Sequence, residues 1–257
     1  MCGIFGFILK EPLQIDIVFR LLEKLEVHKY PQEQKPVGGY GTGIAIIQND
    51  GKVFSKKIGK TNGSPTKHLV KMVGLQEASV LVAHVRMPSE KFMHTAKFAE
   101  ATQPYVANCF RNLTVVSVHN GYVANYKAIR EKLAEHAFES EKVELIDSEV
   151  VPHYFEHLLK EKGDTAKALD TLFSSLEGSN TISLLQSEKD SVFLHLLHKG
   201  KTRGLTVWAN RQKEIVFCSR KEPLLGEFHS VLTERDFKET VSISYGEEKT
   251  LKLSFRI

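Results

Sequence analysis

The chain begins Met1-Cys2-Gly3-Ile4-Phe5-Gly6-Phe7, so a cysteine directly follows the initiator methionine. Removal of Met1 would leave Cys2 with a free α-amine, a group whose reference pKa of about 7.7–8.0 lies close to neutral pH. Such an amine can take the thiol proton and later return it to a leaving group, so that one residue is both nucleophile and base. The stretch also has a simpler interpretation, in which a small residue at position 2 only favours methionine removal.

The composition is that of an ordinary globular protein. The chain has 257 residues, of which 42% are hydrophobic and 26% charged, and these values exclude disordered and collagen-like classes. It has no apolar stretch of membrane-spanning length and no secretory signal, so we expect a cytoplasmic protein without a membrane partner. A net charge of +4, spread along the chain, predicts no nucleic-acid partner. Three scattered cysteines predict no disulfide framework.

Hydrophobic periodicity predicts a mixture of hairpins and clustered helices. Apolar residues recur at helical spacing between Ile15 and Leu25 and predict a helix over 13–25. The segments 44–48 and 52–57, on either side of Asn49-Asp50-Gly51, predict a hairpin. Further strands are predicted at 79–85, 113–118, 180–186, 191–198, 204–209, 214–219, 241–244 and 251–255, and helices at 125–136, 148–160 and 164–176. This order favours one α+β domain over residues 1–257.

Six short segments stand out because of their order along the chain, and a seventh follows near its end. They are Met1–Ile4, Gly39–Ala45, Ala83–Arg86, Ala101–Pro104, His119–Gly121 and Asp147–Val150, followed by Val216–Leu224. In this order and at similar spacing they resemble the class II glutamine amidotransferases, from residue 2 to about residue 225. The resemblance implies the four-layer αββα sandwich of the N-terminal-nucleophile hydrolases, with two antiparallel sheets. It also implies hydrolysis of the side-chain amide of glutamine.

The resemblance further implies a role for particular residues in the chemistry. Cys2 is the implied nucleophile, which forms a γ-glutamyl thioester and releases ammonia. Asn120 and Gly121 are the implied oxyanion hole, through a side-chain amide and a backbone N–H.

Three other residues are implied to bind the substrate. Arg86 is the implied clamp of the α-carboxylate, because a guanidinium donates two parallel hydrogen bonds. Asp147 is the implied partner of the α-ammonium, although Asp-Ser-Glu before an apolar run is also typical of a helix N-cap. Ser89 loosely matches a hydroxyl that follows the arginine, and Gln103-Pro104 is interpreted as loop geometry.

Two segments depart from the family pattern. Many members carry an Arg-Gly pair and an aspartate before the Gly-Ile-Ala segment, where this chain has His28–Pro31 and Gly39–Thr42. Met87–His94 lacks the residues that usually follow the arginine. The loops that close over the substrate are therefore expected to differ.

The sequence predicts no metal and no cofactor. His153 and His157, and likewise His195 and His198, have a spacing that permits ligation, but no third ligand accompanies either pair at a convincing spacing. We therefore expect packed or solvent-facing histidines. Cys109 and Cys218 are expected to be packed thiols, and there is no phosphate-binding or dinucleotide-binding fingerprint.

The chain beyond residue 225 is too short for a further catalytic domain. We therefore expect either a stand-alone enzyme that acts on glutamine or another γ-glutamyl compound, or a subunit that delivers ammonia to a separate synthase. Two alternatives stay open. One is a cysteine amidase for acyl amides, and the other is a catalytically silent regulatory subunit that retains Met1. The sequence also leaves open whether the chain forms a homo-oligomer.

Overall fold

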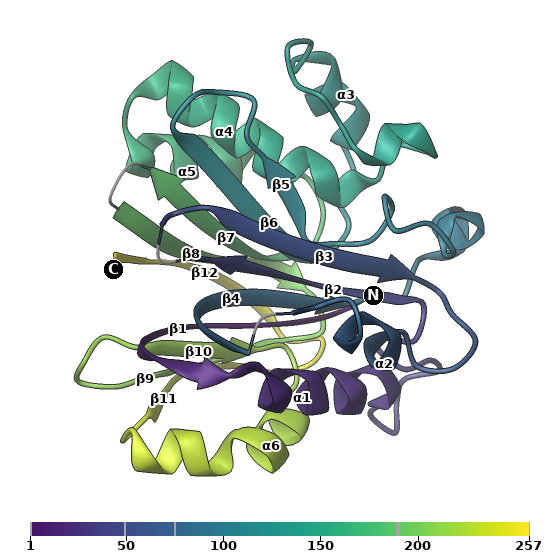
Figure 1. Ribbon diagram of the computed structural model, residues 1–257. Helices are drawn as coiled ribbons and strands as arrows, with labels where there is room; N and C mark the ends of the chain where they lie inside the picture. Colours follow the sequence, from purple (N-terminus) through teal and green to yellow (C-terminus); the bar gives the residue numbers. More distant parts are fainter. Residues whose placement is uncertain (1, 49, 75, 189–190, 257) are drawn as a thin grey trace.

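Two antiparallel β-sheets lie face to face between two layers of helices (Figure 1). The computed structural model describes residues 2–48, 50–74, 76–188 and 191–256. The larger sheet has the strand order β11-β9-β10-β1-β4-β2-β3, and the smaller has the order β12-β8-β7-β6-β5. This arrangement confirms the expected four-layer α+β sandwich.

The strands have the following bounds. They are β1 Gly3–Gln14, β2 Gly41–Ile47, β3 Val53–Gly59, β4 Glu77–Val85, β5 Tyr105–Ala107, β6 Leu113–Gly121, β7 Asn180–Glu188, β8 Ser191–Lys201, β9 Leu205–Ala209, β10 Ile215–Cys218, β11 Lys238–Ile243 and β12 Glu248–Arg256.

The α-helices are α1 Ile15–Val27, α2 Pro65–Val70, α3 Tyr126–Glu131, α4 Val150–Lys162, α5 Thr165–Ser175 and α6 Lys221–Glu234. Short 3₁₀ helices are η1 Glu90–Thr95, η2 Ser140–Lys142 and η3 Asp147–Glu149. Figure 1 shows α1, α2 and α6 on the outer face of the larger sheet and α3, α4 and α5 on that of the smaller. Among the described residues, none of the helices combines the length and the hydropathy that crossing a bilayer requires.

Three apolar cores follow from this layering, because alternate side chains of a strand point to opposite faces of its sheet. On β4, Leu81 and Ala83 pack toward the helices of the larger sheet, while Val80 and Val82 pack toward the other sheet. On β6, Val116 lies in the same core between the sheets. Each sheet is therefore apolar on both faces, which explains why several strands read as nearly continuous hydrophobic runs.

The predicted strands all lie within observed strands or overlap them, and Asp164 is the N-cap of helix α5. Its side chain accepts a hydrogen bond from the backbone N–H of Lys167 at 2.8 Å. The predicted hairpin is present as β2 paired with β3, although Asn49 in its turn lies outside the described residues, as does Met1.

Three helix boundaries differ from the prediction. The first helix begins at Ile15, because Leu13 and Gln14 still pair with β4. The helix predicted at 125–136 ends at Glu131. The chain after it forms tighter turns, in which the N–H of Leu133 donates to the carbonyl oxygen of Arg130. The helix predicted at 148–160 begins as the 3₁₀ turn η3. The sequence does not predict strands β1 and β5 or helices α2 and α6.

We predict that Val118→Ala destabilises the sandwich while Val27→Ala does not. Val118 is fully buried in the core between the sheets, whereas Val27 is 74% exposed at the end of α1. Loss of two buried methyl groups should lower the free energy of unfolding by about 2–3 kcal/mol. Urea unfolding of both variants measures the difference, and equal midpoints would contradict this assignment of the core.

Candidate functional site

The alternation of side chains brings three predicted residues to one end of the space between the sheets. Ile4 of β1 and Val118 of β6 both point into the core between the sheets. Cys2 and Asn120 lie two residues from them, on the same sides of their strands. Gly3 pairs with Val85 in the antiparallel ladder between β1 and β4. Cys2, which precedes Gly3, therefore lies beside Arg86, which follows Val85.

Cys2 is held by three hydrogen bonds that connect the two sheets with the segment after β4. Its backbone nitrogen donates to Asn120 Oδ1 at 3.2 Å. Its Sγ accepts the backbone N–H of Met87 at 3.3 Å and donates to the carbonyl oxygen of Met87 at 3.5 Å. Because Oδ1 of Asn120 accepts the hydrogen bond from Cys2, the amide nitrogen Nδ2 of the same side chain is the group that can donate to a ligand. This nitrogen is buried and has no hydrogen-bond partner among the described residues. An amide donor is thus available beside the thiol.

Gly121 ends strand β6 in a conformation that requires glycine. Its φ is +151°, and a Cβ at this position would lie 2.1 Å from the carbonyl oxygen of Ser179. The close approach of β7 therefore excludes a side chain here. As a result, backbone rather than a side chain borders the pocket beside Asn120.

Arg86 follows β4 directly and is 4% exposed. Its Nη1 donates to the carbonyl oxygen of Thr95 at 3.0 Å, and its Nη2 donates to Thr95 Oγ1 at 2.6 Å. These two bonds fix the guanidinium plane and leave further N–H donors for a ligand. Burial lowers the pKa of Arg86, but a guanidinium keeps its charge in proteins.

Asp147 opens the 3₁₀ turn η3 and is 5% exposed. Its Oδ2 accepts the backbone N–H of Val123 at 2.9 Å. Burial raises the pKa of this carboxyl to about 6, and the Val123 N–H opposes that shift only in part. The carboxylate makes no side-chain cap of a helix, so the helix-cap interpretation of Asp147 is wrong. A buried carboxylate with so little compensation is suited to receive a cationic group.

One cavity of about 380 Å³ collects five of the six predicted residues in its lining. These are Cys2, Arg86, Ser89, Gly121 and Asp147, and Asn120 is bonded to Cys2 beneath them. Ser89 is exposed at the rim, where it precedes η1. The cavity thus has a nucleophilic atom, a cationic group and an anionic group at different points of its wall.

Sequence reasoning missed the residues that support this wall. His119 bonds through Nδ1 to Ser148 Oγ at 2.8 Å and through Nε2 to Asn180 Oδ1 at 2.9 Å. Burial lowers the pKa of His119 to about 4, so the ring is neutral at pH 7. The side chain of Gln103 pairs with both backbone groups of His119. Gln103 therefore fixes the strand that presents Asn120, and its place within a motif was the only sequence sign of that role.

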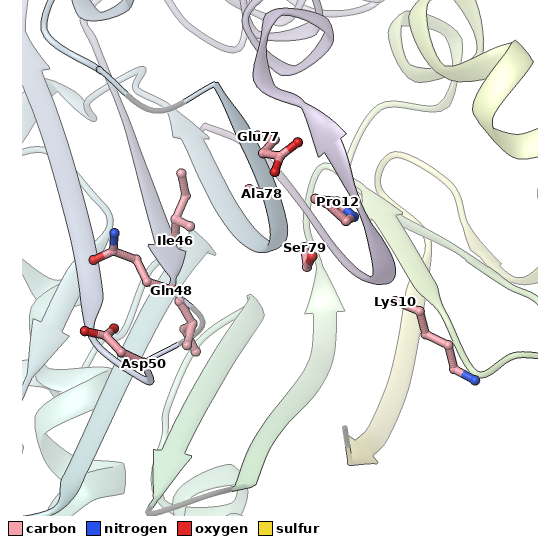
Figure 2. Close-up of a pocket in the computed structure, with 9 residues that line it drawn as sticks. Lys10, Pro12, Ile46, Gln48, Asp50, Glu77, Ala78 and Ser79 are labelled. Carbon is pink, nitrogen blue, oxygen red and sulfur yellow. The ribbon is translucent and has the colours of Figure 1, made fainter.

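A second cavity, of about 520 Å³, lies among the ends of β1, β2 and β4. Figure 2 shows its labelled side chains spread around the rim, with Lys10 far from Gln48 and Asp50. Of the described residues that line it, none is cysteine, histidine or arginine. The cavity that contains Cys2 is therefore the better candidate for catalysis.

Comparison with known proteins matches the chain to a family model and to several larger enzymes. A family model described as the glutamine amidotransferase domain matches residues 91–226. Glutamine–fructose-6-phosphate aminotransferase (isomerizing) of Sulfurisphaera tokodaii is 29% identical over 197 residues, which are 75% of this chain and 30% of that protein. The Campylobacter jejuni protein of the same description is 26% identical over 98% of this chain and 37% of its own length. The chain thus spans about a third of these relatives.

Solved structures with the same layering belong to larger enzymes. The glutamine phosphoribosylpyrophosphate amidotransferase of B. subtilis aligns with a TM-score of 0.61 and 17% identity, over 98% of this chain and 49% of that one. A structure described as the allosteric regulatory enzyme of purine biosynthesis aligns with a TM-score of 0.64 and 15% identity, over 98% of this chain and 48% of that one. At these identities the likeness shows the fold alone, the αββα sandwich of the N-terminal-nucleophile hydrolases.

We predict that Asp147→Asn stabilises the protein at neutral pH. The folded-state pKa of about 6 exceeds the ordinary aspartate value of 3.8, so the folded state binds more protons and stability falls as pH rises between these values. Removing the buried charge should raise the free energy of unfolding at pH 7 by about 2–3 kcal/mol, and the gain should vanish below pH 4. Urea unfolding at both pH values tests this. Asp50→Asn is the control, because Lys52 lowers the pKa of the exposed Asp50, and it should give no gain.

Proposed function

Because the chain belongs to the glutamine amidotransferase family, we propose that it hydrolyses the side-chain amide of glutamine to glutamate and ammonia. The observation that carries the proposal is the amide nitrogen of Asn120, which has no hydrogen-bond partner among the described residues and lies beside Cys2. Cys2 lines a cavity together with Arg86 and Asp147. A nucleophile, an oxyanion donor, a carboxylate site and an ammonium site are what this reaction requires.

Substrate binding follows from the charges of the wall. The α-carboxylate of glutamine pairs with the free N–H donors of Arg86, and its α-ammonium pairs with Asp147. The amide carbon then lies toward Cys2. An acyl amide would bury these two charged side chains without a counter-charge, which costs several kcal/mol, so the charges oppose the acyl amidase alternative.

The reaction begins with Met1 removed, so that the nitrogen of Cys2 is an α-amine held by Asn120 Oδ1. The amine takes the thiol proton, and Sγ attacks the amide carbon. The resulting oxyanion accepts hydrogen bonds from Asn120 Nδ2 and the N–H of Gly121. The carbon–nitrogen bond breaks, and the proton returns to the leaving ammonia. Water activated by the same amine then cleaves the thioester and releases glutamate.

The ammonia then acts as a nucleophile on an acceptor molecule. This acceptor is bound by a separate synthase subunit or by another part of a larger protein. We place the reaction in the cytoplasm, where glutamine and reduced thiols are available. Other γ-glutamyl compounds share the α-carboxylate and α-ammonium and would bind in the same way.

We predict that Cys2→Ala abolishes glutaminase activity and labelling by the glutamine analogue 6-diazo-5-oxo-norleucine. Intact mass spectrometry of the chain without substitutions should show loss of the Met1 mass and the addition of one molecule of the analogue. Cys218→Ala is the matched control, because burial raises the pKa of this thiol to about 12 and the variant should keep both activity and adduct. Asn120→Ala should lower kcat by about 10²–10³.

Retained Met1, no adduct and no turnover would overturn this proposal and favour the silent regulatory subunit. Turnover by Cys2→Ala that equals the unmodified chain would exclude Cys2 as nucleophile.

We predict that kcat/KM for glutamine falls as pH decreases through about 6. Only the carboxylate form of Asp147 pairs with the substrate ammonium, and burial raises its pKa to about 6. Below that pH Asp147 should add about a tenfold decrease per pH unit to the decrease caused by protonation of the Cys2 amine, whose reference pKa lies near 8. Asp147→Asn should be weakly active and lack this second decrease, whereas Asp50→Asn should retain it. A second decrease near pH 6 in Asp147→Asn would show that another group titrates.

A further inference from the structure

A second group of chemically reactive side chains lies under helix α4, apart from the cavity that contains Cys2. It consists of Cys109, His136, His153 and Glu156, and we refer to these four residues as the Cys109 cluster. One ligand atom from each residue lies within 4.8 Å of the other three. None of these residues lines the cavity that contains Cys2, and the proposed reaction does not use them.

Three segments that are distant in sequence supply the cluster. Cys109 follows strand β5, and His136 follows the turns after α3. His153 and Glu156 are three residues apart on α4 and therefore share a helix face. The fold thus assembles the cluster from a β-connection, a loop and a helix.

Three of the distances between the ligand atoms fit the edges of a tetrahedron around one ion, and all of them lie within 4.8 Å. His136 Nδ1 lies 3.3 Å from His153 Nδ1 and 3.4 Å from Glu156 Oε2, and Cys109 Sγ lies 3.7 Å from His153 Nδ1. Zinc bonds of about 2.0–2.1 Å to nitrogen or oxygen and about 2.3 Å to sulfur give tetrahedral edges of about 3.3 and 3.6 Å. The observed separations match both edges.

Glu156 supplies an independent reason to expect a cation. Its side chain is fully buried, and Oε1 accepts the backbone N–H of Phe110 at 3.1 Å. Oε2 points into the cluster and has no hydrogen-bond partner among the described residues. A buried carboxylate oxygen without a donor is costly unless a cation neutralises it.

We propose that the Cys109 cluster binds one Zn²⁺ ion in a closed, structural site. One thiolate, one carboxylate and two neutral imidazoles balance the two positive charges and complete a four-coordinate shell. Four protein ligands leave no position for substrate, so the ion stabilises the fold and takes no part in catalysis.

The sequence predicts no metal here because only two of the four ligands, His153 and Glu156, lie near each other along the chain. His153 was paired with His157 by spacing, whereas the structure pairs it with Glu156 on the helix and with Cys109 and His136 from elsewhere. The metal-free alternative is a packed imidazole pair in which His136 also faces Glu156. That alternative leaves the Cys109 thiol without a function in the cluster, and it requires no metal in the purified chain.

A bound ion would also support the proposed active site. It would cross-link the connection between β5 and β6 to α4. Because α4 directly follows the 3₁₀ turn that contains Asp147, this link would also stabilise the position of Asp147. His153 Nε2 lies 3.9 Å from Glu149 Oε1, which is longer than a hydrogen bond, so the carboxylate faces the ring without bonding to it.

The test uses the whole chain, purified without chelator and without a polyhistidine tag. Inductively coupled plasma mass spectrometry should find about one zinc per chain. Removal of the metal should lower the thermal midpoint, and added Zn²⁺ should restore it. Co²⁺ added to the metal-free chain should give the visible absorption of a tetrahedral site with a thiolate-to-cobalt charge-transfer band.

Matched variants separate the cluster from other binding. Cys109→Ser should lose the charge-transfer band and His153→Gln should lose most of the zinc, while His157→Gln, one turn away and outside the cluster, should keep both. Cys2→Ala should also keep both, so the result does not depend on the proposed function. A folded chain without zinc and without a cobalt spectrum would overturn the proposal, as would metal that only Cys2→Ala removes.

Discussion

The contact between the two sheets is the constraint on which the proposed site depends. Cys2 precedes a strand of the larger sheet and Asn120 lies in the smaller one, yet the nitrogen of the first bonds to the amide oxygen of the second. This bond requires both sheets to keep their spacing and rotation. The apolar core between them, which includes Ile4 and Val118, holds that geometry because close-packed interiors deform little. Packing far from the chemistry therefore decides whether thiol and amide meet.

Residues with unusual chemistry could be predicted from the sequence, and residues that position them could not. Cys2 is recognisable from its own chemistry, a thiol next to a removable Met1, whereas the roles of Arg86 and Asp147 are implied only by the resemblance to a family. His119 and Gln103 are ordinary polar residues whose importance comes from burial and from one another. Their partners are fixed only when strands and turns meet.

The same limit explains the errors in the elements. Strand β1 was missed because its residues from Gly3 to Leu9 are buried on both faces, and such a run has no alternation to reveal it. The helix predicted at 125–136 ends early because tertiary contacts, not propensity, decide where a short helix stops. The Cys109 cluster depends on three such segments at once, so local spacing could not have found it.

The position of the Cys2 nitrogen has a practical consequence for anyone who handles the protein. That nitrogen is already committed to Asn120 at the floor of the cavity. An affinity tag joined ahead of Cys2 would convert the amine into an amide. The residues of the tag would also occupy the cavity in which the substrate is proposed to bind. Recombinant protein should carry its tag after β12, at the edge of the smaller sheet, or be released by a protease that leaves cysteine as the first residue.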